Sequence, residues 1–377
     1  MTAARPAGSA AERDAMSIPL LTIAAVIALA FANGANDVSK GIATLAGSGR
    51  ATYRQALAWG TLWTAAGAFA AVIISIGLIK VFTSSLVADD VLAMSSFPLA
   101  VAAGASIWVL FASVTGLPVS TTHALTGAIV GVALSTGGVE VIRWGLLLSG
   151  IAAPLALSPL VSGVLGYSLH GVASRIECAC VCAEHQVTLP VVNSDGTLAV
   201  RSVPMIVTSA VGCDPAPGRM RLMAGHITHW GAAAAISFAR GVNDNSKIAA
   251  LGTLAFASMG AGVAGAFALT ALAMTVGSFA AGLRVSRTLG DRVVHMHTDT
   301  GLAGALVAAG LVMAASFATL PVSTTHVSTG AIVGAGVRQG ARAVQWGTVA
   351  SLVIAWLVTL PVCAMLGAVS AWFVRAS

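Results

Sequence analysis

Apolar residues run in long uninterrupted stretches along most of the chain. Four examples are residues 53–80, 144–170, 254–283 and 344–374. Each is long enough to cross a bilayer as a helix, which takes about 20 residues. The alternation of apolar and polar residues that is typical of a spanning β-barrel does not occur. The pattern therefore predicts an all-α polytopic membrane protein with about 10–12 membrane segments.

Two motifs occur twice along the chain. The sequence LPVSTTHALTGAIVG at 117–131 returns as LPVSTTHVSTGAIVG at 320–334, with 13 of 15 positions identical and an offset of 203 residues. The sequence FANGANDVSK at 31–40 returns as FARGVNDNSK at 238–247, with 7 of 10 positions identical and an offset of 207 residues. The nearly equal offsets indicate that one half of the chain repeats the other.

A hydrophilic segment separates the two halves. It is rich in proline and charged residues, which is typical of a loop or a small insert outside the membrane. The chain therefore divides into a polar N-terminal tail (1–17), a first transmembrane repeat (18–170), a hydrophilic central loop (171–223) and a second transmembrane repeat (224–377).

Charged residues predict how the repeats are oriented. The linker after the second long apolar stretch holds Lys80 with Asp89 and Asp90 in the first half, but Arg284, Arg287 and Arg292 in the second. If the two PVSTTH segments form re-entrant hairpins, 11 basic residues lie on the side of the central loop and 5 on the side of the termini. Because basic residues mark cytoplasmic loops, we expect inverted repeats in the cell (inner) membrane, with both termini outside and the central loop cytoplasmic.

Overall composition agrees with a protein embedded in lipid. Charged residues make up 8% of the chain and hydrophobic residues 57%, whereas soluble proteins carry about 25% charged residues. The net charge of +6 is explained by basic cytoplasmic loops, and no basic run interleaved with aromatic residues indicates nucleic-acid binding.

Three cysteines in the central loop lie close together in sequence. Cys178, Cys180 and Cys182, with His185 nearby, could bind a metal, although their spacing matches no standard zinc pattern. Thiols without a ligand in a reduced cytoplasmic loop are the favoured interpretation. We expect no resident cofactor.

Ionisable residues lie in apolar surroundings within the first motif. Asp37, Lys40, Arg240, Asp244 and Lys247 would sit at bilayer depth, where charge is costly and usually lines a substrate or ion path. A purely structural ion pair at spacing i, i+3 is the alternative. The occurrence of the same pair in both halves favours one shared central site.

The same motifs contain glycine and asparagine where an apolar helix would continue. Residues 33–36 and 240–243 are therefore expected to break their helices, which would free carbonyl groups and helix ends to bind ions. The side-chain oxygens of Asn36, Asp37, Asn243 and Asp244 suit a small cation, and the carboxylates could instead carry a proton.

The second motif places hydroxyl groups at the start of a helix. Pro118 and Pro321 favour a helix that begins just after them. Free backbone N–H groups, hydroxyl groups and the positive end of the helix dipole would then converge, which is typical of an anion site. Ordinary N-capping is the alternative. The hydroxyl residues are Ser120, Thr121, Thr122, Ser323, Thr324 and Thr325.

A histidine follows each group of hydroxyl residues. His123 and His326 could contact the anion or shuttle a proton. A histidine that only satisfies a neighbouring carbonyl group is an equally good interpretation.

The four motif copies together resemble the PiT family of inorganic phosphate transporters. The similarity covers nearly the whole chain except the N-terminal tail and the central loop. It implies two inverted repeats, symport of phosphate with sodium or protons, and often a homodimer. Some bacterial members carry sulfate.

The resemblance also implies roles for individual residues. Asp37 and Asp244 would bind the coupling ion, Asn36 and Asn243 would serve the ion and phosphate sites, and the six hydroxyl residues would contact the anion. Two features depart from the family. Lys40 stands where many relatives have asparagine, and residues 97–116 and 301–320 hold an acidic residue in many relatives but none here. These departures favour proton coupling, and they leave Lys40 and Lys247 able to face the anion.

The sequence therefore predicts a secondary active transporter that imports inorganic phosphate together with protons or sodium. A sulfate or related oxyanion permease of the same fold is the main alternative, and a channel is another. An intramembrane enzyme is disfavoured, because each candidate residue is duplicated, whereas a catalytic site combines residues with distinct roles.

Overall fold

The computed structural model describes residues 10–74, 77–83, 86–178, 180–209, 220–260 and 262–376. Helices dominate both halves. The first half contains α1 (Ala10–Gly47), α2 (Tyr53–Ile74), α3 (Gly77–Thr83), α4 (Asp89–Leu92), α5 (Phe97–Thr115), α6 (Thr121–Gly137), α7 (Trp144–Leu146) and α8 (Ala153–Cys178), with a π-helical segment Leu147–Ala152 before α8. The second half contains α9 (Ala224–Ser258), α10 (Gly262–Ala281), α11 (Leu283–Asp291), α12 (Thr298–Phe317), α13 (Thr324–Gln339) and α14 (Trp346–Ala376).

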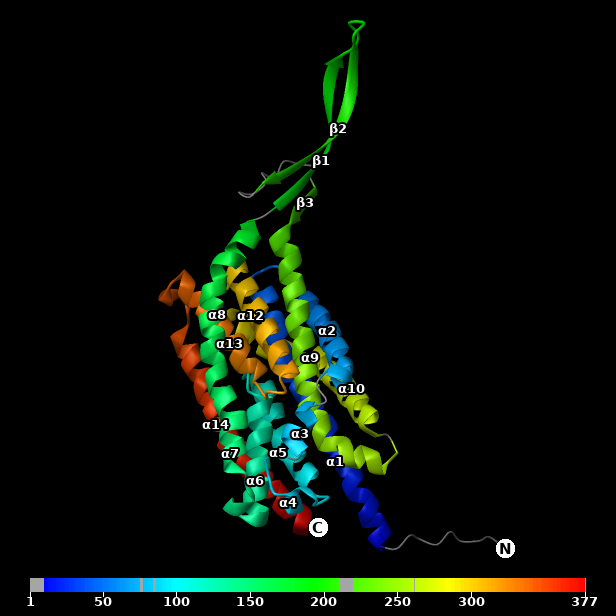
Figure 1. Ribbon diagram of the computed structural model, residues 1–377, viewed down its shortest axis with the longest axis vertical. Helices are drawn as coiled ribbons and strands as arrows, with labels where there is room; N and C mark the ends of the chain where they lie inside the picture. The colour runs from blue at the N-terminus through cyan, green and yellow to red at the C-terminus, as the bar shows by residue number, and fades with distance from the viewer. Residues whose placement is uncertain are drawn as a thin grey trace, which may run out of the picture.

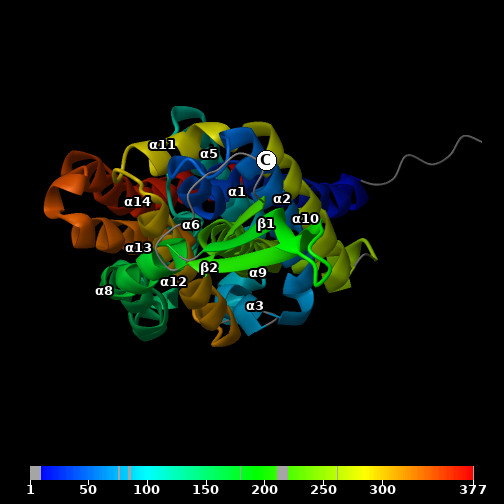
Figure 2. The same ribbon diagram turned by 90° about the horizontal axis from the view of Figure 1, so that it is seen from above.

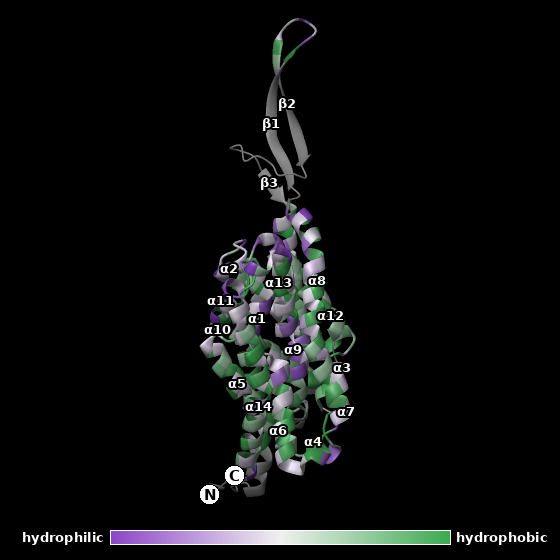
Figure 3. Ribbon diagram, turned by 90° about the vertical axis from the view of Figure 1, so that its left-hand side faces the viewer, coloured by the Kyte–Doolittle hydropathy of each residue, from purple (hydrophilic) through white to green (hydrophobic). Residues whose placement is uncertain are grey.

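Within the described residues, seven helices are long and apolar enough to cross a membrane: α1, α2, α5, α8, α10, α12 and α14. The protein is therefore an integral membrane protein, as the sequence predicted. Helix α9 has the length to cross but carries charges in its middle, where Figure 3 shows hydrophilic residues within the largely hydrophobic body. Helices α6 and α13 are short. With these three, the described residues reach ten segments, the lower end of the predicted range.

Two helical hairpins meet near the middle of the molecule. Helix α5 packs on α6 and α12 packs on α13, and the pairs lie in the lower and upper halves of the helical body in Figure 1. Each hairpin turns at equivalent positions, Gly116 with φ 80° and Thr319 with φ 55°. Each return helix then begins after a proline and an N-cap serine. The PVSTTH segments therefore lie at the turns of helical hairpins, and that these hairpins re-enter the membrane stays a prediction.

The two halves contribute equivalent helices that pack across each other. Helix α2 packs on α9 while α10 packs on α1, and α6 packs on α14 while α13 packs on α8. Seen along the long axis, α1 and α9 lie near the middle, with α8, α14 and α10 toward the rim (Figure 2). Helix α1 begins at the end of the molecule that holds both termini, whereas α9 begins at the opposite end, beside β3 (Figure 1). These opposite directions support inverted repeats, which remain an interpretation.

The predicted helix breaks do not occur. Helices α1 and α9 continue without interruption through residues 33–36 and 240–243. A glycine inside a helix costs only about 1 kcal/mol, which is less than the cost of leaving buried backbone groups without partners. Glycine is needed there for close approach instead. A Cβ atom on Gly34 would lie 2.0 Å from the carbonyl oxygen of Met274, and one on Gly241 would lie 2.3 Å from that of Thr64.

This close approach gives a testable prediction about stability. We expect Gly34→Ala to lower the free energy of unfolding by about 1–3 kcal/mol, because the added methyl group forces α1 away from α10. Gly310→Ala is the matched control, since its added Cβ atom meets no atom within 4 Å and alanine favours a helix. Thermal unfolding of the purified proteins in detergent would measure both. Equal midpoints for the two variants would contradict the packing role of Gly34.

The central segment contains strands as well as loop. The strands β1 (Cys180–Val192), β2 (Leu198–Ser209) and β3 (Met220–Met223) form an antiparallel sheet in the order β2-β1-β3. Runs of valine, isoleucine and threonine explain these strands. The sequence analysis predicted a loop because the segment is hydrophilic overall.

The side chains of Cys178, Cys180 and Cys182 lie outside the described part of the structure, so their metal site stays a prediction. Elsewhere in the described residues, no group of three or more His, Cys, Asp or Glu side chains could hold a metal ion.

Candidate functional site

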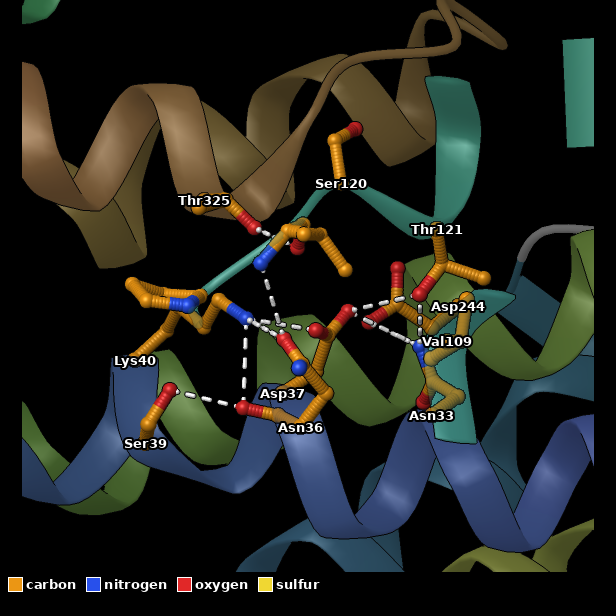
Figure 4. A network of polar contacts seen from close by, with 12 residues as sticks. Asn33, Asn36, Asp37, Ser39, Lys40, Val109, Ser120, Thr121, Asp244 and Thr325 are labelled. Atoms are coloured by element: carbon orange, nitrogen blue, oxygen red, sulfur yellow. Dashed lines mark hydrogen bonds and ion pairs between the residues drawn. The ribbon is translucent and has the colours of Figure 1, made fainter. Parts of the chain in front are cut away.

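The polar residues of α1 lie at the centre of the helical body. Asn33, Asn36, Asp37 and Lys40 are at most 1% exposed. The Lys40 ammonium lies 2.5 Å from Asp37 Oδ1 and donates to Asn36 Oδ1 over 3.1 Å. A buried charge at this depth is tolerated because its partner and further oxygens surround it. Figure 4 shows these side chains pointing toward one another from α1.

The carboxylates of the two repeats come together at one amide group. Asn33 Nδ2 donates to Asp37 Oδ2 over 2.9 Å and to Asp244 Oδ2 over 3.4 Å. It also donates to the hydroxyl of Thr121 at the start of α6, which in turn donates to Asp37 Oδ2 over 3.2 Å. Two aspartates that are 207 residues apart therefore share one buried network, as the duplicated motif predicted (Figure 4).

The N-cap serines use their hydroxyl groups locally. Ser120 Oγ accepts a hydrogen bond from the backbone N–H of His123, and Ser323 Oγ accepts one from the backbone N–H of His326, each over 3.2 Å. This is the capping geometry that was considered as the alternative for these residues.

The threonines of the two hairpins reach across to each other. Thr122 Oγ1 donates to the carbonyl oxygen of Val322 over 3.2 Å, and Thr325 Oγ1 donates to that of Val119 over 2.8 Å. These are equivalent contacts made in opposite directions. They bring the N-terminal ends of α6 and α13 together, so two positive helix ends converge on the carboxylate network. Thr324, only 3% exposed, also lies in the first turn of α13.

The two lysines make different contacts although they occupy equivalent positions. Lys247 lies 3.3 Å from Asp244 Oδ1 and also donates to Thr122 Oγ1 and to the carbonyl oxygen of Val322, each over 2.9 Å. It therefore joins α9 to both hairpin tips. The hydrogen bonds of the Lys40 ammonium stay within α1.

Two asparagines connect the central helices to the hairpins by hydrogen bonds. Asn36 Nδ2 donates to the carbonyl oxygen of Leu117 over 2.8 Å and to Ser113 Oγ over 3.4 Å. Asn243 Nδ2 donates to Ser316 Oγ over 3.0 Å. The sequence analysis missed both serines. Their signal is a polar residue within an apolar helix, repeated at the offset of 203 that relates the second motif.

The histidines meet each other on another side of the hairpin helices. The rings of His123 and His326 are 4.6 Å apart, and His326 Nδ1 lies 3.0 Å from the carbonyl oxygen of Leu155. Both line a largely apolar cavity of about 590 Å³ with Ile151 and Trp356. Among the described residues, no hydrogen bond joins either ring to the carboxylates.

Arg240 is a further charged residue of the centre. It is fully buried, and its Nε, Nη1 and Nη2 atoms find no hydrogen-bond partner among the described residues. The sequence analysis counted Arg240 among the buried charges but gave it no role.

A basic cavity approaches this network from one end of the bundle. It measures about 810 Å³ and is lined by Ala35 of α1 and by Ser113 of α5. Arg284, Arg287 and Arg292 line it as well, and all three are exposed. Because Ser113 accepts a hydrogen bond from Asn36, the cavity reaches the edge of the polar network.

Comparison with known proteins gives one consistent group of matches. A family model described as "Phosphate transporter family" matches residues 33–367. A "Probable low-affinity inorganic phosphate transporter" of Mycobacterium leprae is 28% identical over 367 residues, covering 94% of this chain and 78% of that protein. A protein of the same description from Bacillus subtilis is 27% identical over 364 residues, covering 94% and 96%.

A solved structure has a similar fold. It is described as "The sodium-dependent phosphate transporter", and it superposes with a TM-score of 0.75 at 20% identity, covering 96% of this chain and 99% of that one. At this identity the match bears on the fold.

Proposed function

The chain belongs to the phosphate transporter family, and from that premise we propose that it imports inorganic phosphate as a secondary active symporter. The observation that carries the proposal is the meeting of two helix N-termini with two buried carboxylates at one point. Helix N-termini attract anions, whereas carboxylates carry protons or bind cations. One site therefore offers the chemistry for both partners of a symport.

In this proposal the hairpin tips bind the anion. The first turns of α6 and α13 supply backbone N–H groups together with the hydroxyl groups of Thr121, Thr122, Thr324 and Thr325. The serines contribute by capping these helices, so their backbone and not their hydroxyl groups would face phosphate. Three further pairs would complete the site: Asn36 with Asn243, Lys40 with Lys247, and the carboxylates Asp37 with Asp244 as the coupling groups.

Buried ammonium groups favour protons as the coupling ion. Each carboxylate already has a lysine partner, at 2.5 Å for Asp37 and 3.3 Å for Asp244. A sodium ion would need these same oxygens as ligands and would meet a fixed positive charge beside them. Sodium remains the second candidate, because the solved structure with the similar fold is described as sodium-dependent.

The membrane arrangement is part of the same proposal. We place the protein in the inner membrane, with both termini outside and the central segment in the cytoplasm, because basic residues gather on that side. A homodimer stays a prediction from the family resemblance. Sulfate is the alternative substrate, since it is also a tetrahedral oxyanion.

Uptake of radiolabelled phosphate into proteoliposomes tests the function. The purified protein would face an imposed pH gradient or sodium gradient, with excess sulfate as competitor. We expect uptake that follows the pH gradient and persists in sulfate. Sulfate accumulation without phosphate uptake would contradict the proposed substrate, and a strict need for sodium would contradict proton coupling.

The basic cavity predicts a dependence on ionic strength. We expect the triple variant Arg284→Gln, Arg287→Gln, Arg292→Gln to raise the KM for phosphate that enters from the side of the central segment about tenfold at low salt, because the positive charges of the cavity raise the local anion concentration there. The difference should shrink at high salt, where charges are screened. Initial rates of phosphate transport from that side of the membrane, at several salt concentrations, would measure it. Exposed Arg342 provides the control variant Arg342→Gln, and an equal rise there would point to net charge instead of the cavity.

A further inference from the structure

Arg240 carries a buried charge without hydrogen-bonding partners. Its side chain is 0% exposed, and none of its three guanidinium nitrogens has a partner among the described residues. A guanidinium group has five N–H donors. Burying these donors without hydrogen bonds is strongly unfavourable. Such a group calls for an explanation other than stability.

The position of Arg240 directs its charge toward the carboxylate network. It lies four residues before Asp244 on α9, as Asn33 lies four residues before Asp37 on α1. Residues four apart share one face of a helix. The charge of Arg240 interacts electrostatically with Asp244 and Asp37. The Nδ2 group of Asn33 is engaged with the carboxylates and Thr121, whereas at the equivalent place in the second repeat the guanidinium donors of Arg240 have no partner among the described residues.

We propose that Arg240 is the principal ligand of the transported oxyanion. The proposal follows from the geometry of its side chain. The planar fork of a guanidinium group matches two oxygens of a tetrahedral anion. A fully buried fork whose charge acts on the two carboxylates of the site has its donors satisfied when that anion arrives.

This inference rests on the proposed function and names the group that holds the substrate.

The first experiment compares Arg240→Gln and Arg240→Lys with the wild type in proteoliposomes. We expect the KM for phosphate to rise about 100-fold or more in Arg240→Gln, because a buried charge-assisted contact is lost. Arg240→Lys should fall between the two, because lysine keeps the charge and loses the fork. Size-exclusion profiles and Arg342→Gln would verify folding and baseline activity. A wild-type KM in Arg240→Gln would overturn the role of Arg240.

The second experiment separates a failure of this inference from a failure of the proposed function. Uptake of labelled phosphate and of labelled sulfate by the wild type and by Arg240→Gln would be measured at neutral pH. If the wild type carried only sulfate, the proposed function would fail, and sulfate uptake by Arg240→Gln would still decide whether Arg240 is the ligand.

Discussion

Replacement of Asp244 with asparagine is expected to lower gradient-driven phosphate uptake by about 100-fold or more. Asparagine keeps the size of the side chain but cannot carry a proton or bind a cation by charge. The loss should concern coupling more than binding of the anion, because removal of a negative charge does not weaken an anion site. Asp37→Asn should behave alike, since both carboxylates contact Asn33 Nδ2.

Two transport modes separate these effects. Net uptake driven by a pH gradient would be measured beside exchange of labelled for unlabelled phosphate at equal concentrations. We expect the variant to lose net uptake and to keep exchange within about tenfold of the wild type. The matched control is Asp89→Asn, because Asp89 is a carboxylate at the exposed end of the bundle, paired with Arg143. Full net uptake by Asp244→Asn would remove Asp244 from the coupling mechanism.

Replacement of Lys247 with methionine is expected to destabilise the protein by about 3–5 kcal/mol, the cost of leaving a buried carboxylate without its partner. The lysine is 1% exposed. The variant loses the contact with Asp244 and also the two hydrogen bonds that hold the hairpin tips, to Thr122 and Val322. We expect Lys40→Met to alter contacts within α1 only.

A double variant distinguishes charge from packing. Asp244→Asn combined with Lys247→Met removes both charges, so most of the stability lost in Lys247→Met should return. Unfolding midpoints of the single and double variants in detergent would measure this. If the double variant were as unstable as Lys247→Met, the cost would come from the lost hairpin contacts and not from the unpaired carboxylate.

The sequence predicted the membrane class and the family because these depend on local signals. Long apolar stretches identify membrane helices whatever their neighbours. The duplicated Asn-Asp and Ser-Thr-Thr-His motifs also identified the residues that meet at the centre, since a charged residue is excluded from lipid unless it has a partner. Asp37, Asp244 and Lys247 meet there with Thr121 and Thr122 for this reason.

Features that depend on neighbouring helices could not be predicted from the sequence. Gly34 looked like a helix breaker, but its role is set by the carbonyl group of Met274 on another helix. The sequence left the histidines with two interpretations, and their contacts depend on other helices: the His326 ring meets the carbonyl oxygen of Leu155 and the ring of Trp356, and the His123 ring lies beside that of His326. Ser113 gave only a weak signal, because a single serine in an apolar helix usually bonds its own backbone. The lack of a partner for Arg240 is visible only once its surroundings are known.

The unequal contacts of Lys40 and Lys247 carry a consequence for alternating access. If the two halves are inverted repeats, either half could adopt the arrangement now seen in the other. After such an exchange, Lys40 would reach the hydroxyl of Thr325 and the carbonyl oxygen of Val119, and Lys247 would withdraw onto α9. The basic cavity would close, and its counterpart beside Ser316 would open at the opposite end. The structure would then represent one of two states that are related by an exchange of the two halves, and the two lysines would change their hydrogen-bond partners between these states.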